Sequence, residues 1–261
     1  RLFEEMGQEP NREKFIALFG EKATTPGYGA IFSRARVVGK LEYPHEIANA
    51  HNAHPKGILH TLPYEEVGPI GELDREFRKF GGALKIQLDK GDEGDDLPHY
   101  GCLSVGLGFN NITTKLSRYC SKLFEIDYVP LLPKDRKRFP AGADIPKISD
   151  DFVINHNGVE AHPSKWVQVE GGEDYALIAR ILHDGKPYII CAGRTADGTA
   201  AALKFLARHW LRIVGLYKED RANLETDNMV AILSHQHELR EPGELKAHFF
   251  AEAPKAEWQF P

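Results

Sequence analysis

The stretch that decides the fold is KPYIICAGRTADGTAAALKFLARHWLRIVG, residues 186–215. Its first part, Tyr188 to Ala192, is a nearly continuous apolar run, which is typical of a strand covered on both faces. Residues 193–199 form a polar loop bracketed by two glycines. The remainder places its apolar residues at helical spacing, and we expect that helix to end at Gly215. The stretch therefore predicts a strand, a tight loop and a helix in succession.

A strand that enters a helix through a glycine loop points backbone N–H groups and the positive end of the helix at one place, which favours an anion. The candidate ligand-binding residues of this loop are Gly193, Arg194, Thr195, Gly198 and Thr199. The two glycines have the spacing of a P-loop, but Thr199-Ala200 stands where lysine and serine or threonine are needed, which argues against an NTPase. The alternative interpretation is that the glycines only make a tight turn.

A second unit of the same kind spans residues 101–123. An apolar strand at 102–105 precedes Gly106-Leu107-Gly108, and a helix follows with Asn110 or Asn111 as its N-cap. The two glycines begin a dinucleotide fingerprint, but Asn111 occupies the position of the third glycine, which argues against NAD. An anion at the start of this helix is the more economical prediction.

A third loop follows the apolar run 152–154 and contains Asn155 and Asn157. In open α/β sheets the loops at the carboxyl ends of strands gather at one crevice. We therefore expect loops 106–111, 155–158 and 193–199 to converge there. The ligand-binding candidates in the first two of these loops along the chain are Gly106, Gly108, Asn110, Asn111, Asn155 and Asn157.

The rest of the chain alternates strands and helices, which predicts an α/β fold with mostly parallel sheets. We expect strands at 28–32, 83–88, 229–233 and 245–250, and a helix from Pro69 to Phe80. Asp184-Gly185 between two apolar runs predicts an antiparallel hairpin. Residues 130–150 contain four prolines and a basic cluster. This segment predicts two lobes, an N-terminal α/β lobe at 1–140 and a C-terminal lobe at 141–261.

Composition limits the classes of function. The chain has 261 residues and a formal net charge of −5, which argues against a generally nucleic-acid-coating surface. Its apolar runs are too short to span a bilayer. The three cysteines, Cys102, Cys120 and Cys191, are widely spaced and odd in number, which favours a reducing compartment and predicts a cytoplasmic protein.

Other side chains offer rival chemistries. The histidines at 45, 51, 54, 60, 235 and 237 invite a metal interpretation, but isolated histidine pairs are usually exposed, and we predict no metal. Glu173, beside Gly171-Gly172, is the carboxylate with which a glycosidase-type acid would be built, although a turn explains it too. Lys204, Arg208 and Arg212 follow each other at helical spacing. They form a solvated face or a docking strip for an acidic protein or a nucleic acid.

The pattern Asp174-Tyr175-x-Leu177-Ile178, a hairpin, Ala192-Gly193 and Gly198-Thr199-x-Ala201-Ala202 resembles a Rossmann-like domain of uncharacterised bacterial proteins, over residues 150–250. This resemblance implies a fold and no activity. We therefore expect a cytosolic Rossmann-like protein that binds a small anionic ligand, with a nucleotide as first choice and the cofactor unknown. The alternatives are a hydrolase that cleaves a nucleotide or N-glycosidic bond, and an interaction scaffold with an empty crevice.

Overall fold

A computed structural model describes residues 2–33, 35–36, 58–59, 64–89, 97–107, 110–120, 123–129, 148–156, 159–167, 173–236 and 242–254. The helices are α1 (Leu2–Phe19), α3 (Tyr64–Lys79), α4 (Asn111–Tyr119) and α6 (Ala196–Glu219), with short 3-10 turns η1 (Glu21–Thr24) and η3 (Pro163–Lys165). The strands are β1 (Pro26–Phe32), β2 (Ala35–Arg36), β3 (Ile58–Leu59), β4 (Ala83–Leu88), β5 (Leu103–Val105), β6 (Phe124–Val129), β7 (Ile148–His156), β8 (Val159–Ala161), β9 (Glu173–His183), β10 (Lys186–Gly193), β11 (Asp227–Gln236) and β12 (Glu244–Glu252).

One mixed sheet of seven strands, in the order β12-β11-β9-β10-β5-β1-β4, forms the centre of the molecule. β4, β1, β5 and β10 run parallel to one another. β9, β11 and β12 are added by antiparallel pairing. This confirms the expected α/β class with a parallel part and antiparallel additions. Two smaller antiparallel sheets accompany it, β2-β3 and β6-β7-β8.

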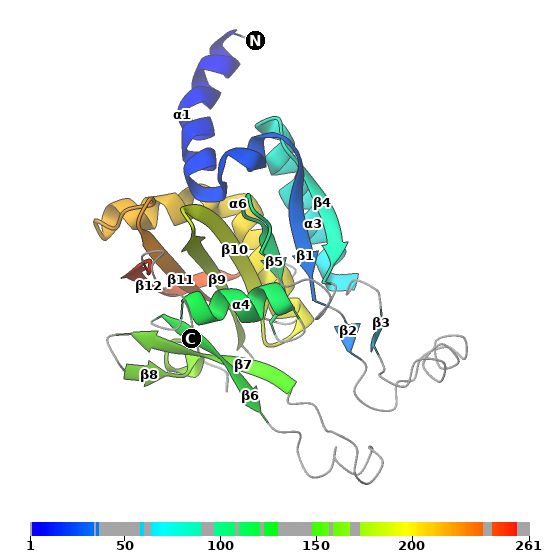
Figure 1. The fold of residues 1–261 in the computed structure, drawn as a ribbon, viewed down its shortest axis with the longest axis vertical. Helices are drawn as coiled ribbons and strands as arrows, with labels where there is room; N and C mark the ends of the chain where they lie inside the picture. The colour runs from blue at the N-terminus through cyan, green and yellow to red at the C-terminus, as the bar shows by residue number, and fades with distance from the viewer. Residues whose placement is uncertain are drawn as a thin grey trace.

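The two faces of the main sheet are covered differently (Figure 1). On one face α1, α3 and α6 enclose a core that includes Phe15, Phe77 and Trp210. On the other face α4 and the three-stranded sheet pack, with Leu116 and Phe152 in a second core. Because side chains alternate along a strand, β9 and β10 supply both cores, and Asp174–Leu182 and Pro187–Gly193 are buried.

The hairpin between β9 and β10 is formed as predicted. His183 pairs with Lys186, so Asp184 and Gly185 are its two loop residues. Their φ angles are 50° and 68°, the left-handed conformation that a type I′ turn requires at both positions. Aspartate and glycine tolerate this conformation better than other residues, which is why the pair is such a clear local signal.

Two helix boundaries were predicted wrongly. α3 begins at Tyr64, so Pro69 lies inside it and does not start it. α6 continues past Gly215 to Glu219, because Leu216 and Tyr217 extend its buried face. In both cases tertiary packing outweighs the local preference of proline or glycine.

Arg180 ties α1 to the amino-terminal side of the sheet. It lies on β9 and is only 2% exposed. Its Nε donates to the carbonyl of Leu18 (3.1 Å) and its Nη2 to that of Ala17 (2.9 Å), the last carbonyls of α1. Its Nη1 donates to the carbonyl of Asp227 at 3.4 Å. A cation is favourable at a helix C-terminus, so this buried guanidinium serves the fold.

The main sheet takes β1, β4 and β5 from the first part of the chain and β9 to β12 from the second. The predicted division into 1–140 and 141–261 therefore crosses one sheet, and two lobes are not confirmed. Most of the proline-rich segment 130–150 lies outside the described residues. Among the described helices, none combines the length and the apolar character that a bilayer-spanning helix needs.

Candidate functional site at the carboxyl edge of the sheet

The segments that follow the four parallel strands lie side by side at one edge of the sheet. The N–H of Asp89 donates to the carbonyl of Phe32 (2.9 Å). The N–H of Ser33 donates to that of Val105 (2.8 Å). One strand further, the N–H of Gly106 donates to the carbonyl of Cys191 at 2.9 Å. The loops that begin at Gly106 and after β10 therefore face the same side, as predicted.

The loop 155–158 was predicted to join the other two loops at this edge, and this prediction was wrong. β7 pairs with β6 and β8 in the separate antiparallel sheet and is not a strand of the main sheet. Asn155 is a residue of β7 and pairs with Glu160, while Asn157 lies outside the described residues. An apolar run alone cannot reveal which sheet a strand will join, and the prediction assumed the wrong one.

The junction between β5 and α4 is closed by Asn110. Its side-chain oxygen accepts hydrogen bonds from the N–H groups of Ile112 (3.0 Å) and Thr113 (3.2 Å). Its amide nitrogen donates to the carbonyls of Ile31 (2.8 Å) and Val105 (3.1 Å). Asn110 is the predicted N-cap, but its bonding capacity is used within the protein. It joins the ends of two strands to the start of a helix.

Two other residues of this junction were candidates for ligand binding. The N–H of Asn111 donates to Asp89 Oδ2 at 3.3 Å, so a carboxylate of the protein lies at the start of α4. Gly108 lies outside the described residues. Gly106 has a φ of 93°, which favours glycine, and a Cβ there would stand 2.2 Å from Ser33 Oγ. That Oγ is buried, and no described residue forms a hydrogen bond with it.

The junction between β10 and α6 is built on close backbone contact. A Cβ on Gly193 would lie 2.5 Å from the carbonyl carbon of Gly198 and from the nitrogen of Thr199. Thr195 is the N-cap, because its Oγ1 accepts from the N–H of Gly198 at 3.1 Å. The hydroxyl of Thr199 accepts from the N–H of Gly193 at 3.1 Å. These four candidates are thus held in contacts that shape the loop.

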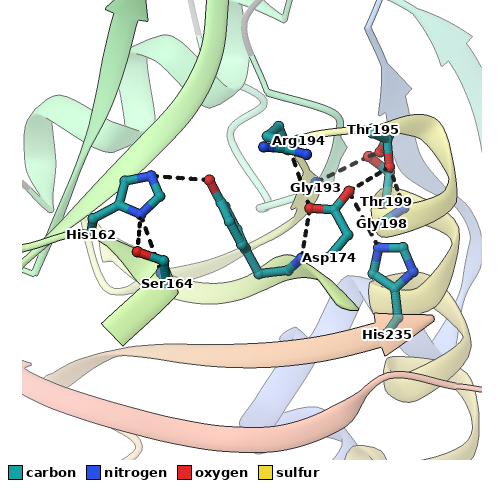
Figure 2. A network of polar contacts seen from close by, with 10 residues as sticks. His162, Ser164, Asp174, Gly193, Arg194, Thr195, Gly198, Thr199 and His235 are labelled. Atoms are coloured by element: carbon teal, nitrogen blue, oxygen red, sulfur yellow. Dashed lines mark hydrogen bonds and ion pairs between the residues drawn. The ribbon is translucent and has the colours of Figure 1, made fainter. Parts of the chain in front are cut away.

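A buried carboxylate, Asp174, lies at the centre of this junction (Figure 2). It is the second residue of β9 and is 0% exposed. It accepts hydrogen bonds from the N–H of Tyr175 (2.8 Å) and the hydroxyl of Thr195 (3.1 Å). Arg194 Nε is 3.5 Å and His235 Nε2 3.8 Å from its oxygens. The protein therefore places its own anion beside the N-terminus of α6.

Arg194 is the residue of this cluster that reaches solvent. Its side chain is 41% exposed, while Asp174 is 1% exposed. Its guanidinium stands 5.7 Å from the centre of the Tyr175 ring. No described residue accepts a hydrogen bond from its terminal nitrogens. A planar, partly exposed cation that pairs through Nε with a buried carboxylate is suited to a bidentate contact with an anion.

His162 and Ser164 form a second polar group, apart from Asp174 (Figure 2), which reaches the Tyr175 hydroxyl. His162 Nδ1 accepts from the N–H of Ser164 at 3.2 Å and contacts the Ser164 hydroxyl at 2.7 Å. Since an N–H can only donate, Nδ1 is unprotonated and Nε2 carries the hydrogen. Nε2 then donates to the Tyr175 hydroxyl at 3.1 Å. His162 caps η3, and His162-Pro163-Ser164 is the local signal that would have predicted this cap.

The described residues do not support the alternative predictions of a glycosidase-type acid, a metal site or a reactive cysteine. Glu173 is the first residue of β9, but its side chain lies outside the described residues, as do His45, His51, His54, His60 and His237. Within the described ranges, no three histidine, cysteine or carboxylate side chains cluster as a metal site would need. The three cysteines are buried and free, and burial raises the pKa of each thiol, which makes them poor nucleophiles.

The basic strip on α6 consists of Lys204, Arg208 and Arg212, and two of these residues pair with acidic side chains of the protein. Arg208 donates to Glu72 of α3 from Nε (2.8 Å) and Nη2 (3.0 Å), a bidentate pair. This hydrogen bond lowers the pKa of the Glu72 carboxyl. Arg212 pairs with Glu219 on its own helix. The strip therefore includes two cations with acidic partners inside the protein, and these contacts give no support to an external acidic protein or nucleic acid as its partner.

Neither protein-family models, nor curated proteins, nor solved structures include a match to this chain.

Proposed function

We propose that this protein binds a small anionic ligand, a nucleotide, at the carboxyl edge of its main sheet. The observation that carries the proposal is the change of direction between β1 and β5. From β1 the chain passes to β4 on one side, and later to β5 and β10 on the other. Ligands of open α/β sheets bind where the strand order reverses in this way. The Ser33 hydroxyl, unbonded among the described residues, lies at that point.

The helices next to the reversal support a Rossmann-like description. α3, which connects β1 to β4, packs in the core of one face. α4, which follows β5, packs in the core of the other. Helices that leave neighbouring strands toward opposite faces leave a crevice between their first turns. Gly106 carries no side chain, which lets the Ser33 hydroxyl lie close to the backbone there.

Arg194, which directly follows β10, supplies the charge for the anion, one strand beyond β5. Asp174 holds its Nε, and the Tyr175 ring lies below it. This support lowers the conformational entropy that the side chain loses on binding. A phosphate between Ser33 and Arg194 would receive a hydroxyl and a guanidinium donor. The three free thiols suit the cytoplasmic location that we assign to this function.

Isothermal calorimetry with a panel of nucleotides and inorganic phosphate tests the proposal. We expect Arg194→Ala to weaken nucleotide binding by about 1.5–3 kcal/mol, or roughly 10- to 150-fold, the range for a hydrogen bond to a charged group. Arg212→Ala is the matched control. It removes an arginine of similar exposure, 48%, from the C-terminal half of α6, and should leave binding unchanged. Equal affinities of the wild type and Arg194→Ala, or no binding by the wild type, would contradict the proposal.

The same samples test the two alternatives. Chromatography of the nucleotide after incubation reveals cleavage, which a hydrolase using Glu173 would produce and a binding protein would not. A scaffold would bind no nucleotide. Among described residues the large exposed apolar side chains are spread over separate elements, namely Val67, Ile86, Tyr100, Val159 and Leu211, which does not favour a single docking patch.

A further inference from the structure

The buried stripe of α3 contains a carboxyl group where an apolar side chain is expected. Ile70, Leu73 and Phe77 face the core at helical spacing, and each is at most 3% exposed. Glu66 precedes them by the same spacing and is 5% exposed. Glutamate is rarely buried without a partner, because removing a carboxylate from water is costly. Glu66 therefore occupies its position at a cost in stability.

Glu66 differs from the other buried polar groups of this edge. Asn110 and Asp174 form several hydrogen bonds within the protein. Among the described residues, none forms a hydrogen bond or ion pair with the Glu66 carboxyl. Burial, with a smaller contribution from the neighbouring Glu65, raises the pKa of Glu66 to about 8. At pH 7 the group is then neutral and presents one donor and one acceptor side by side.

The position of Glu66 connects it with the proposed site. α3 links the end of β1 to the start of β4, and these strands are parallel, so α3 begins at the carboxyl edge of the sheet. Glu66 lies in its first turn. Ser33 stands at the same edge, over Gly106, where the chain turns toward α4 on the opposite face. Among the described residues, the carboxyl edge thus has an unbonded carboxyl in the first turn of α3 and an unbonded hydroxyl directly after β1.

We propose that Glu66 recognises an amino-substituted base, adenine or cytosine, of a nucleotide whose phosphate is held by Ser33 and Arg194. This inference rests on the proposed function. In both bases an exocyclic N–H donor lies next to an unprotonated ring nitrogen. A neutral carboxyl complements this pair, since its O–H donates to the ring nitrogen and its carbonyl accepts from the amino group. An ionised carboxylate lacks the donor and would pair poorly.

The sign of the pH dependence follows from this chemistry. Adenine recognition should be complete well below pH 8 and should be lost as Glu66 ionises above it. The free energy of unfolding should depend on pH in the same direction, because the unfolded state binds the Glu66 proton less tightly than the folded state does. Stability contributed by Glu66 falls as the pH rises from the usual carboxyl range through 8. Besides Glu65, the ionisable residues in the first ten positions of α6, which packs beside α3, are Asp197 and Lys204.

Calorimetry with adenosine 5′-monophosphate and ribose 5-phosphate, on the full chain at pH 6.5 and 9, tests the inference. We expect the base to increase wild-type affinity about tenfold at pH 6.5, the scale of two neutral hydrogen bonds, and much less at pH 9. Glu66→Leu should abolish the gain and leave ribose 5-phosphate binding intact. Glu66→Gln, which keeps a donor and an acceptor, should retain the gain at both pH values.

Thermal melts provide the structural control. Glu66→Leu completes the apolar stripe and should raise the melting temperature, so a loss of binding would not reflect unfolding. If Glu66→Leu binds adenosine 5′-monophosphate as tightly as the wild type does, or if ribose 5-phosphate binds equally well at pH 6.5, base recognition by Glu66 is wrong and the anion site still stands. If neither compound binds, the proposed function fails, and this inference fails with it.

Discussion

The two strand–loop–helix junctions, β5–α4 and β10–α6, follow the same plan but use their polar groups differently. In the first, the Asn110 side chain forms four hydrogen bonds within the protein and is fully buried. In the second, a cap, Thr195, and a buried carboxylate, Asp174, support a half-exposed cation, Arg194. One junction joins structural elements only, while the other also presents a positioned charge to solvent. Similar loops can therefore use all their polar groups within the protein or leave a charge exposed, and the hydrogen-bond partners distinguish the two.

The largest expected effect breaks the second junction outright. In Gly193→Ala the new Cβ would lie 2.5 Å from the backbone of Gly198 and Thr199, which cannot move without displacing α6. We expect a loss of about 4 kcal/mol or more in the free energy of unfolding. Gly215→Ala is the control, because the nearest atom to its Cβ is 4.0 Å away on the flexible Glu219 side chain. That change should stabilise α6 slightly. Urea melts that show equal stabilities would contradict the close contact.

Asn110→Ala tests the closed character of the first junction. It removes a helix cap and one donor from each of the carbonyls of Ile31 and Val105, of which Val105 keeps the N–H of Ser33. We expect a loss of about 3 kcal/mol by chemical denaturation. Thr195→Ala, at the equivalent cap, should cost about 1 kcal/mol, because it caps Gly198 and serves one carboxylate. A reversed order of the two losses would show that the comparison of the junctions is wrong.

Asp174→Asn should affect both stability and binding. The amide keeps the size of the side chain but loses the negative charge that holds Arg194 and accepts from Thr195. We expect about 2 kcal/mol of destabilisation, in the range for a buried hydrogen-bonded charge, and weaker nucleotide binding. Differential scanning fluorimetry and calorimetry on the same sample separate the two effects. Wild-type affinity in this variant would mean that Asp174 does not position Arg194.

The smallest effect on stability is expected for Arg194→Ala. The Arg194 side chain is half-exposed, so water screens its pairing with Asp174, and the loss should stay within about 0.5 kcal/mol. Its effect should appear in ligand affinity. Thermal melts alongside the calorimetry compare the effect on stability with the effect on affinity. A loss of stability as large as that of Asp174→Asn would make Arg194 a structural residue.

Local patterns determined much of the fold. The Asp184-Gly185 hairpin, the cap at Asn110 and the strand–loop–helix stretch at 186–215 are encoded by neighbouring residues, and they were predicted. The candidate site was predicted in part, since Arg194 and the shared side of two loops follow from the parallel strands. Ser33 carried no signal in the sequence, because a serine after a strand is common and its hydroxyl becomes significant only beside Gly106.

The sequence by itself determined the α/β class, the glycine-bracketed junctions and the residues able to cap them, because backbone conformation and helix caps depend on residues a few positions apart. Only the tertiary structure decided that β7 joins a separate sheet, that Arg180 reaches the end of α1, and that Asp174 meets Thr195 and His235. The side-chain contacts among these join residues 21 to 163 positions apart in the chain. Their formation depends on how whole faces of helices and strands bury their apolar surface, which no local spacing records.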